Sequence, residues 1–354
     1  MTATMNISGR SIGQDSPVYL IAEMSANHGR DFDRALAILR AAKEAGADAV
    51  KLQTYTPDTM TLDCDAEPFR IKGTIWEGRN LHDLYGEAYT PWEWQPKLKK
   101  AADDLGLDLF STPFDATAVD FLEDMGAPAH KVASFEVVDI PLLRKIGATG
   151  KPVIMSTGMA TLGEIDEAVR TLRGAGCGEL ALLKCSSAYP APASDMNLRT
   201  IPHLGQAFGA VPGLSDHTLG TEAAVAAVAL GARIVEKHFT LSRSDGGPDA
   251  AFSLEPEEFA SMARAVRNVE QALGAVCYDL TDKQRASAAF RRSLWVAEDI
   301  AEGEVLTEKN IRCLRPAGGM HPRHLEEMLG RRASRGLKKG EPLDMTMAAS
   351  PPNG

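Results

Sequence analysis

Cysteine is scarce in this chain, and the few cysteines present show no pairing pattern. The five cysteines are scattered over 354 residues, are odd in number and include no Cys-x-x-Cys spacing. This distribution argues against a disulfide framework and against a zinc finger. It is typical of a protein kept in a reducing environment, so we expect a cytoplasmic location.

Long apolar runs are also absent. No stretch is long enough to cross a bilayer, and the polar segment 1–14 lacks the apolar core of a signal peptide. We therefore expect no membrane partner, and the net charge of −10 argues against nucleic acid. The charge is uneven, because residues 285–340 carry twelve Lys or Arg against seven Asp or Glu. This basic stretch is either a cover for an anionic ligand or an ordinary solvated surface.

Short apolar runs alternate with segments of helical periodicity through the first 240 residues. The predicted strands lie at 18–23, 49–53, 107–111, 130–134, 151–156 and 180–185, and two more end near His217 and His238. Helices are predicted at 32–45, 91–105, 115–125, 139–147, 162–173, 194–208 and 221–231. Eight such repeats in about 250 residues predict a (β/α)8 barrel. A doubly wound sheet is the alternative, but no Gly-x-Gly-x-x-Gly follows the first strand.

Composition shifts divide the rest of the chain. After a last helix near 256–273, we expect the barrel domain to comprise 1–274, a linker 275–289 and a small domain 290–354. The connection 54–90 is far longer than an ordinary βα loop. This connection is either a lid over the site, facing the substrate, or an insertion that has no role in the site.

Every predicted strand ends in polar side chains that a barrel interior does not need. Because side chains alternate along a strand, Lys51 and Gln53 share one face, and so do Glu236 and His238. By the same alternation, Lys131 and Ser134 face the site together only if their strand is bulged or already ending. A buried lysine needs a partner, which is either a bound anion or a neighbouring carboxylate such as Glu23 or Glu136.

Two histidines stand at the ends of neighbouring predicted strands. Imidazole is a common ligand of transition metals, so His217 and His238 predict a divalent metal site. Beside it, lysines and hydroxyls predict a pocket for a phosphorylated or carboxylated anion. Addition of phosphoenolpyruvate to a polarised aldehyde fits these groups, as do a metal-dependent aldolase and a phosphosugar lyase.

Five segments resemble the sialic acid synthase family. They read Glu-Met-Ser-Ala-Asn-His at 23–28, Lys-Leu-Gln-Thr at 51–54, Ser-Thr-Gly-Met at 156–159, Gly-Leu-Ser-Asp-His-Thr at 213–218 and Glu-Lys-His-Phe-Thr at 236–240. The resemblance covers nearly the whole chain and includes a C-terminal antifreeze-like (SAF) domain. Other segments are most similar to the pseudaminate branch: Tyr-Thr-Pro-Asp at 55–58, Thr-Pro-Trp-Glu-Trp at 90–94, Ala-Ser-Phe-Glu at 133–136 and Phe-Ser-Leu at 252–254.

This resemblance implies an enzyme that condenses phosphoenolpyruvate with an N-acylated aldose and water, with release of phosphate. For the pseudaminate branch the aldose is 2,4-diacetamido-2,4,6-trideoxy-L-altrose, and the alternatives are N-acetylneuraminate or legionaminate synthesis from a different N-acyl aldose. The pathway context that it implies is glycosylation of flagellin or of a surface polysaccharide.

The resemblance also implies roles for individual residues. His217 and His238 would bind the divalent ion, with Mn²⁺ expected first and Mg²⁺ or Co²⁺ as alternatives. Glu23 would orient or activate water, and Glu136 would be its proton-handling partner. The positions implied for phosphoenolpyruvate are Lys51, Gln53, Thr112, Lys131, Ser134, Ser156, Ser187 and Ser215. The family often has Asn in place of Ser187.

The sugar is expected to contact Tyr189, Asp249 and Arg315. In the family, the arginine corresponding to Arg315 reaches from the C-terminal domain of one subunit into the barrel of the other, which implies a domain-swapped homodimer. A catalytically silent carbohydrate-binding protein is the competing class of function. It is disfavoured because a binder does not need both histidines, both lysines and Glu23.

Overall fold

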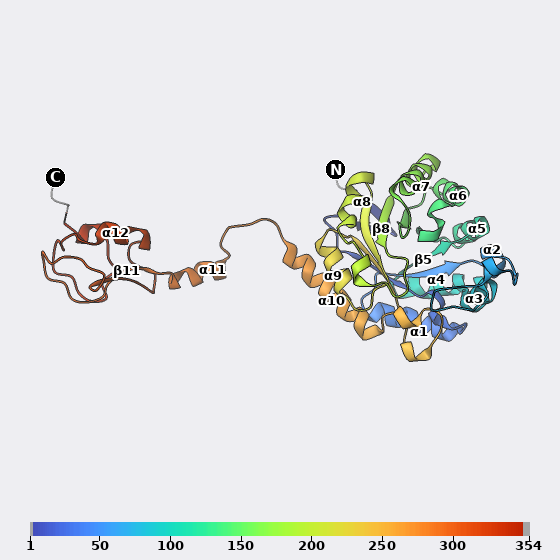
Figure 1. Cartoon of the computed structure of the whole chain (residues 1–354), viewed down its shortest axis with the longest axis horizontal. Helices are drawn as coiled ribbons and strands as arrows, with labels where there is room; N and C mark the ends of the chain where they lie inside the picture. The colour runs from blue at the N-terminus through green and yellow to red at the C-terminus, as the bar shows by residue number, and fades with distance from the viewer. Residues whose placement is uncertain (1–2, 350–354) are drawn as a thin grey trace. The chain divides into compact units, whose positions relative to one another are not determined.

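Eight parallel strands form a closed barrel, and helices surround it (Figure 1). The structure is a computed structural model and describes residues 3–349. In pairing order the strands are β10 (Ile234–His238), β3 (Tyr19–Glu23), β4 (Ala49–Thr54), β5 (Asp108–Pro113), β6 (His130–Val132), β7 (Val153–Ser156), β8 (Leu180–Cys185) and β9 (Val211–Asp216). Because β10 pairs with β3, the sheet closes. The predicted (β/α)8 barrel is confirmed, and the doubly wound sheet is excluded.

The helices around the barrel follow the predicted positions, except that two begin later than predicted, at Gln95 instead of 91 and at Thr200 instead of 194. They are α1 (Phe32–Glu44), α4 (Gln95–Asp104), α5 (Ala116–Asp124), α6 (Ile140–Ala148), α7 (Leu162–Ala175), α8 (Thr200–Phe208), α9 (Glu222–Ala229) and α10 (Pro256–Leu273). The helix predicted from 194 begins only at Thr200, because Asn197 takes a left-handed φ of 43°. Every residue of β3 and β10 is buried. Because both faces are covered, β3 is apolar up to Glu23, as buried parallel strands usually are, whereas β10 also buries the polar residues Glu236, Lys237 and His238.

A short antiparallel hairpin precedes the barrel and fills its amino-terminal end. Its strands are β1 (Met5–Ile7) and β2 (Arg10–Ile12), and both Ser8 and Gly9 in the turn have positive φ, as a tight hairpin requires. One apolar cluster joins hairpin and barrel interior and includes Met5, Ile7, Ile12, Phe110 and Ile154. The sequence pattern predicts no strand before residue 18, because three-residue strands are too short to show alternation.

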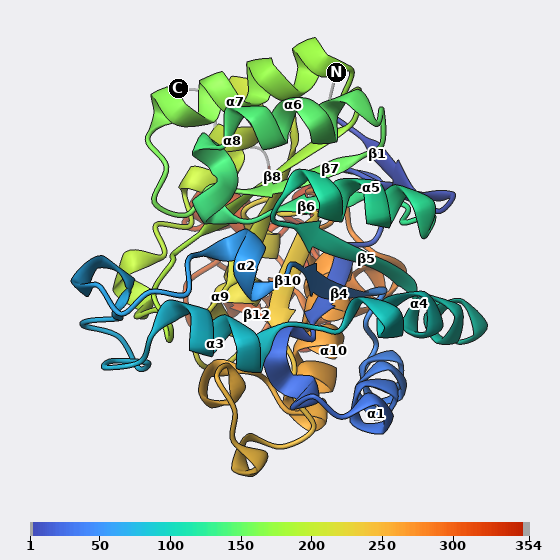
Figure 2. The ribbon, with the colours of Figure 1, turned by 90° about the vertical axis from the view of Figure 1, so that its right-hand side faces the viewer.

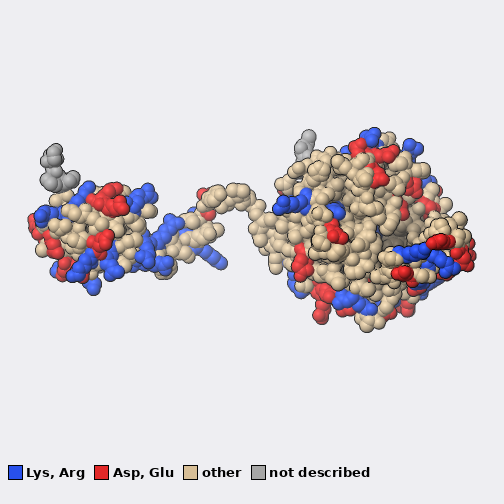
Figure 3. Space-filling model, in the orientation of Figure 1, with Lys and Arg blue, Asp and Glu red and all other residues tan. Residues whose placement is uncertain are grey.

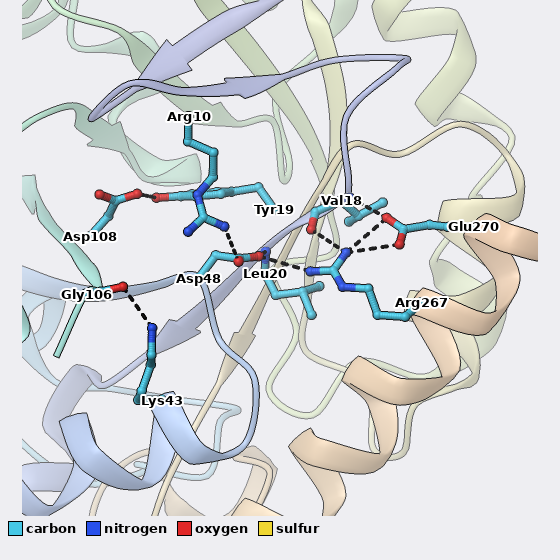
Figure 4. Close-up of polar contacts among 10 residues, drawn as sticks. All are labelled: Arg10, Val18, Tyr19, Leu20, Lys43, Asp48, Gly106, Asp108, Arg267 and Glu270. Carbon is cyan, nitrogen blue, oxygen red and sulfur yellow. Dashed lines mark hydrogen bonds and ion pairs between the residues drawn. The ribbon is translucent and has the colours of Figure 1, made fainter.

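Asp48 connects the hairpin, β3 and α10 at this end of the barrel (Figure 4). Its carboxylate pairs with Arg10 of the hairpin and, at 3.2 Å, with Arg267 of α10. It also accepts the backbone N–H of Leu20 at 2.9 Å. Arg267 in turn lies 3.0 Å from Glu270. One acidic side chain thus ties the hairpin, β3 and the last barrel helix together.

The long connection 54–90 contains α2 (Pro57–Met60) and α3 (Leu81–Ala88), which lie across one end of the barrel (Figure 2). Its far end is held by His28, which is fully buried and whose Nε2 lies 3.1 Å from Thr90 Oγ1. His28 Nδ1 accepts the backbone N–H of Arg30. Burial lowers the pKa of His28 to about 4, so the ring is neutral and Nε2 carries the donated hydrogen.

From Ala275 onward the chain forms a second compact unit with its own apolar core. In it, β11 (Ser293–Val296) pairs antiparallel with β12 (Ile311–Leu314), and α12 (Leu325–Met328) follows. The stretch predicted as a linker, 275–289, contains α11 (Asp282–Ser287). Residues 1–2 and 350–354, which the predicted domain limits include, lie outside the described residues.

Lysine and arginine side chains gather over α11 and the stretch after it (Figure 3). They belong to Lys283, Arg285, Arg291 and Arg292, all of which are exposed. The basic excess expected from the sequence therefore lies on the surface of the second unit. None of the helices formed by residues 3–349 combines the length and apolarity needed to cross a bilayer.

Candidate active site

Closure of the barrel brings polar strand ends from distant parts of the chain to one level. His238 of β10 lies opposite Glu23 of β3, and Glu23 lies opposite Lys51 of β4. In the next pairing, Gln53 lies opposite Thr112 of β5. These side chains meet at the carboxyl ends of the strands, which is where barrel proteins carry their chemistry.

Two lysines and two glutamates form the charged centre of the site. Lys51 Nζ lies 2.7 Å from Glu23 Oε2 and 3.9 Å from Glu236 Oε2, and it also donates to Thr112 Oγ1 at 3.3 Å. Lys131 Nζ lies 3.8 Å from Glu236 Oε1. All four charged side chains belong to residues that are no more than 5% exposed. Two buried ammonium groups thus lie against two buried carboxyl groups, which partner them in low-dielectric surroundings.

Glu236 is missing from the predicted site set. The alternation that turns His238 inward also turns Glu236 inward, so the signal was present in the sequence. Ser215 Oγ donates to Glu236 Oε1 at 3.0 Å. Burial alone would raise the pKa of Glu236, but Lys131 and Lys51 hold that pKa below its ordinary value.

Glu23 behaves differently from Glu236. Burial raises the pKa of Glu23 to about 7, against the lowering effect of Lys51 and with a further increase from Glu236. Two neighbouring carboxyls with pKa values displaced in opposite directions can divide acid and base roles between them. At neutral pH, Glu23 is the one that can gain or lose a proton.

Serines and a glycine form a hydroxyl-rich recess beside Lys131. Lys131 Nζ donates to Ser156 Oγ at 2.6 Å. A β-carbon on Gly158 would lie 2.4 Å from both Ser134 Oγ and Ser187 Oγ, so only glycine lets these hydroxyls converge. Ser187 Oγ has no hydrogen-bond partner within residues 3–349. Hydroxyls and an ammonium group arranged in this way suit a phosphate or carboxylate.

The end of β6 explains how Lys131 and Ser134 reach the same recess. The strand stops at Val132, and after Ala133 a 3₁₀ turn, η4 (Ser134–Val138), begins. The same turn carries Glu136, whose Oε2 has no hydrogen-bond partner among the described side chains and backbone. Burial raises the pKa of Glu136 to about 7. Glu136 is thus a second carboxyl that can exchange a proton near neutral pH.

Gln53 connects Glu23 to Asp249, which is one of the residues predicted to contact the sugar. Its Nε2 donates to Glu23 Oε1 at 3.0 Å and to Ser25 Oγ at 2.9 Å, and Ser25 Oγ donates to the Asp249 carboxylate. Ser25 is a further residue that the sequence pattern does not single out. It has a positive φ of 45° two residues after the end of β3, and that backbone conformation cannot be read from the residue type.

His217 and His238 face each other with ring centroids 5.3 Å apart. His217 Nδ1 lies 2.9 Å from the carbonyl oxygen of Ser186, so Nδ1 carries a hydrogen. Burial would lower the pKa of His217, but the Cys185 thiol and the Ser186 carbonyl raise it above its ordinary value. His238 Nδ1 has no hydrogen-bond partner among the described residues. Burial, reinforced by the neighbouring His217, keeps the pKa of His238 well below its ordinary value, so this imidazole is neutral.

These two imidazoles suit a divalent transition metal ion, because imidazole is a common ligand of such ions. His217 has the backbone-bonded second nitrogen of the usual ligand form, whereas His238 has none among the described residues. Within residues 3–349, no three His, Cys, Asp or Glu side chains are grouped so as to hold a metal ion. An ion held by His217 and His238 alone would have its other positions open to water and substrate.

Cys185 lies beside His217 and is not among the predicted site residues. It ends β8, is buried, and its Sγ lies 3.7 Å from His217 Nδ1. Burial would raise the pKa of this thiol, but His217 lowers it to about 7. Among five scattered cysteines, only its position at a strand end distinguished it.

Aromatic rings line the side of the site that carries His217 and His238. The Tyr189 ring centroid lies 4.5 Å from that of His217 and 5.2 Å from that of Phe252, and Phe252 lies 4.9 Å from His238. Burial raises the pKa of Tyr189 above its ordinary range, so the phenol remains protonated.

Of all the predicted site residues, only Arg315 lies outside the barrel unit. It is exposed and follows β12 directly.

Comparison with known proteins relates both units to described families. The NeuB family matches residues 38–278, and the SAF domain matches residues 291–349. The chain is 45% identical to the pseudaminic acid synthase of Helicobacter pylori, over 92% of this chain and 96% of that protein. It is 35% identical to the N,N'-diacetyllegionaminic acid synthase of Campylobacter jejuni, over 91% of this chain and 97% of that protein.

A solved structure shows the same relationship. The N-acetylneuraminic acid synthetase of Leptospira borgpetersenii superimposes with a TM-score of 0.72 at 30% identity, covering 81% of this chain and 95% of that one. Fold and site define a (β/α)8-barrel protein with a polar centre at the strand ends, followed by an SAF domain. The chain belongs to the NeuB family, and the resemblance to sialic acid synthases inferred from its motifs is confirmed.

Proposed function

We propose that the chain is a pseudaminic acid synthase, a transferase that condenses phosphoenolpyruvate with 2,4-diacetamido-2,4,6-trideoxy-L-altrose and water. The observation that carries this proposal is the 45% identity to the Helicobacter pylori pseudaminic acid synthase over almost the full length of both proteins. Identity to the legionaminic acid synthase of Campylobacter jejuni is lower, at 35%. A synthase for legionaminate or N-acetylneuraminate is the second candidate.

The buried charges support a site for phosphoenolpyruvate, which carries a phosphate and a carboxylate. Lys51 and Lys131 would bind these anionic groups by exchanging part of their contact with Glu23 and Glu236. The remaining contacts would come from Gln53, Thr112, Ser134, Ser156, Ser187 and Ser215. The recess around Gly158 offers several hydroxyls to one oxyanion, which is a favourable arrangement for phosphate.

The reaction joins C3 of phosphoenolpyruvate to the aldehyde carbon of the open-chain sugar. The aldehyde oxygen takes up a proton, water adds at C2 with loss of a proton, and the resulting tetrahedral carbon releases phosphate by C–O cleavage. Glu23 would orient or activate the water, and Glu136 would accept or return the proton. Both carboxyls have pKa values of about 7, which suits proton transfer near neutral pH.

His217 and His238 would hold the divalent ion, Mn²⁺ by preference and Mg²⁺ or Co²⁺ otherwise. When bound, the ion supplies Lewis-acid polarisation of the aldehyde carbonyl. Tyr189 and Asp249 would position the sugar, since Tyr189 packs against His217 and Asp249 connects through Ser25 to Gln53.

We further propose a domain-swapped homodimer in which Arg315 of one chain contacts the sugar in the barrel of the other. The supporting observation is that Arg315 is exposed on the SAF domain, beside a strand end. A cytoplasmic location agrees with the five free cysteines. The product would serve glycosylation of flagellin or of a surface polysaccharide.

The reaction is tested with phosphoenolpyruvate labelled with ¹⁸O in the bridging C–O–P oxygen. With Mn²⁺ and the diacetamido sugar, we expect the label to leave entirely in inorganic phosphate, in step with formation of the nine-carbon acid. Label retained in the acid would contradict C–O cleavage. Absence of phosphate release, in protein that binds the sugar, would favour the carbohydrate-binding alternative.

A further inference from the structure

Trp76 is the one side chain of the segment 72–78 that is not exposed. This segment belongs to the long connection between β4 and β5, and the adjacent Ile75 is 53% exposed. The Trp76 indole Nε1–H donates to the carbonyl oxygen of Pro248 at 3.0 Å. Pro248 directly precedes Asp249, so the indole bridges the long connection to a loop that carries a sugar-side residue.

The same ring continues the aromatic lining of the site. The Trp76 centroid lies 5.9 Å from that of Tyr189, whose ring in turn packs against His217 and Phe252. Trp76 is thus the outer member of an aromatic series that ends at the two histidines. Neither the motifs nor the proposed catalytic steps give this residue a role.

We propose that Trp76 is a specificity-determining residue that forms an apolar wall for the deoxy and N-acyl methyl groups of the sugar. This inference rests on the proposed function. The only polar atom of the indole is already bonded to Pro248, so the ring offers a ligand carbon surface alone. A methyl group gains by leaving water against such a surface, whereas a hydroxyl there would lose its hydrogen bonds.

The wall therefore selects between sugars that share a C1 aldehyde and a C2 acetamido substituent but differ in configuration and in their groups at C4 and C6. A 2,4-diacetamido-2,4,6-trideoxy sugar has a methyl group at C6 and an acetamido group at C4, where N-acetylmannosamine has a hydroxymethyl group and a hydroxyl. Differences of this kind in apolar pockets typically change kcat/KM by about 10- to 200-fold.

The test compares Trp76→Ala, Trp76→Phe and the control Ile75→Ala in the full chain with Mn²⁺ and saturating phosphoenolpyruvate. Initial rates of phosphate release give kcat/KM for the diacetamido sugar and for N-acetylmannosamine. In Trp76→Ala we expect the ratio of the two values to fall by about tenfold or more, with the KM for phosphoenolpyruvate unchanged. Trp76→Phe keeps the apolar ring and should retain most of the preference, and Ile75→Ala should equal wild type.

Three results would overturn the inference: an unchanged ratio in Trp76→Ala, an equal rise in the KM of phosphoenolpyruvate, or equal losses in Trp76→Phe and Trp76→Ala. The last result would assign the effect to the bond with Pro248. If Trp76→Ala unfolds below the assay temperature, Trp76→Leu replaces it as the variant that lacks an aromatic ring. A wild-type enzyme that prefers N-acetylmannosamine would contradict the proposed function instead, so the two failures are distinguishable.

Discussion

At the scale of single residues, the site is built from groups whose ordinary charge states are displaced by burial and by one another. Glu23 and Glu136 have raised pKa values, whereas Lys131 and Lys51 keep Glu236 ionised. The strand-end positions of the lysines, histidines and Glu23 were predictable from alternation and barrel topology. Ser25 and Cys185 were not, because their importance depends on contacts across strands that are distant in the sequence.

Glu136 should make the stability of the fold depend on pH. Its folded-state pKa of about 7 is above the ordinary value of 4.5, so the folded state binds this proton more tightly than the unfolded state does. The contribution to stability is therefore full below about pH 4.5 and is lost as pH rises to about 7, a change of up to about 3 kcal/mol. Glu136→Gln should gain stability relative to wild type at pH 7.5 more than at pH 4.5, measured by urea unfolding. An equal difference at both pH values would show that this carboxyl does not carry the effect.

Gly158→Ala should damage the hydroxyl recess selectively. The added methyl would lie 2.3 Å from Ser134 Cβ, at a residue with a positive φ of 31°. Displacement of Ser134 and Ser187 should raise the KM for phosphoenolpyruvate more than that for the sugar, and overpacking should cost about 1–3 kcal/mol of stability. The control is Gly163→Ala, whose β-carbon meets nothing within 4 Å. A KM for phosphoenolpyruvate equal to wild type would remove the recess from the proposed anion site.

At the scale of elements, register decides which side chains meet. Alternation along β10 turns Glu236 and His238 into the barrel and Lys237 outward. Lys237 Nζ donates to Asp216 Oδ2 at 2.6 Å and to the carbonyl oxygen of Thr218 at 2.7 Å. Both charged side chains are fully buried. This outer pair locks the ends of β9 and β10 together, directly beside both histidines.

Breaking the Lys237–Asp216 pair should lower the stability of the fold and weaken Mn²⁺ binding at His217 and His238, because the pair holds the ends of the two strands that carry or precede them. Lys237→Met leaves the Asp216 carboxylate buried without its counter-charge, which typically costs about 3–5 kcal/mol. The double variant Asp216→Leu with Lys237→Met should recover much of that stability, because no unpaired charge remains. Unfolding free energies and calorimetric Mn²⁺ affinity provide the measurements. If Lys237→Met matched wild type in both, the pair would have no part in holding the strand ends.

At the scale of the whole molecule, the division into a barrel and a small C-terminal domain follows from changes in periodicity and charge along the chain. The hairpin β1–β2 was not predictable, because its three-residue strands show no pattern until they are packed inside the barrel. The long connection 54–90 was recognisable only by its length. Only the structure shows that this connection reaches the site, through the contacts of Trp76 with Pro248 and Tyr189.

Competition among sugars tests the central proposal most directly. The protein is incubated with phosphoenolpyruvate, Mn²⁺ and equal concentrations of 2,4-diacetamido-2,4,6-trideoxy-L-altrose, the diacetamido sugar of legionaminate synthases and N-acetylmannosamine, and the acids formed are resolved by NMR. A pseudaminic acid synthase should yield pseudaminate as the dominant product, by about tenfold or more over each rival. Legionaminate or N-acetylneuraminate as the main product would contradict the account.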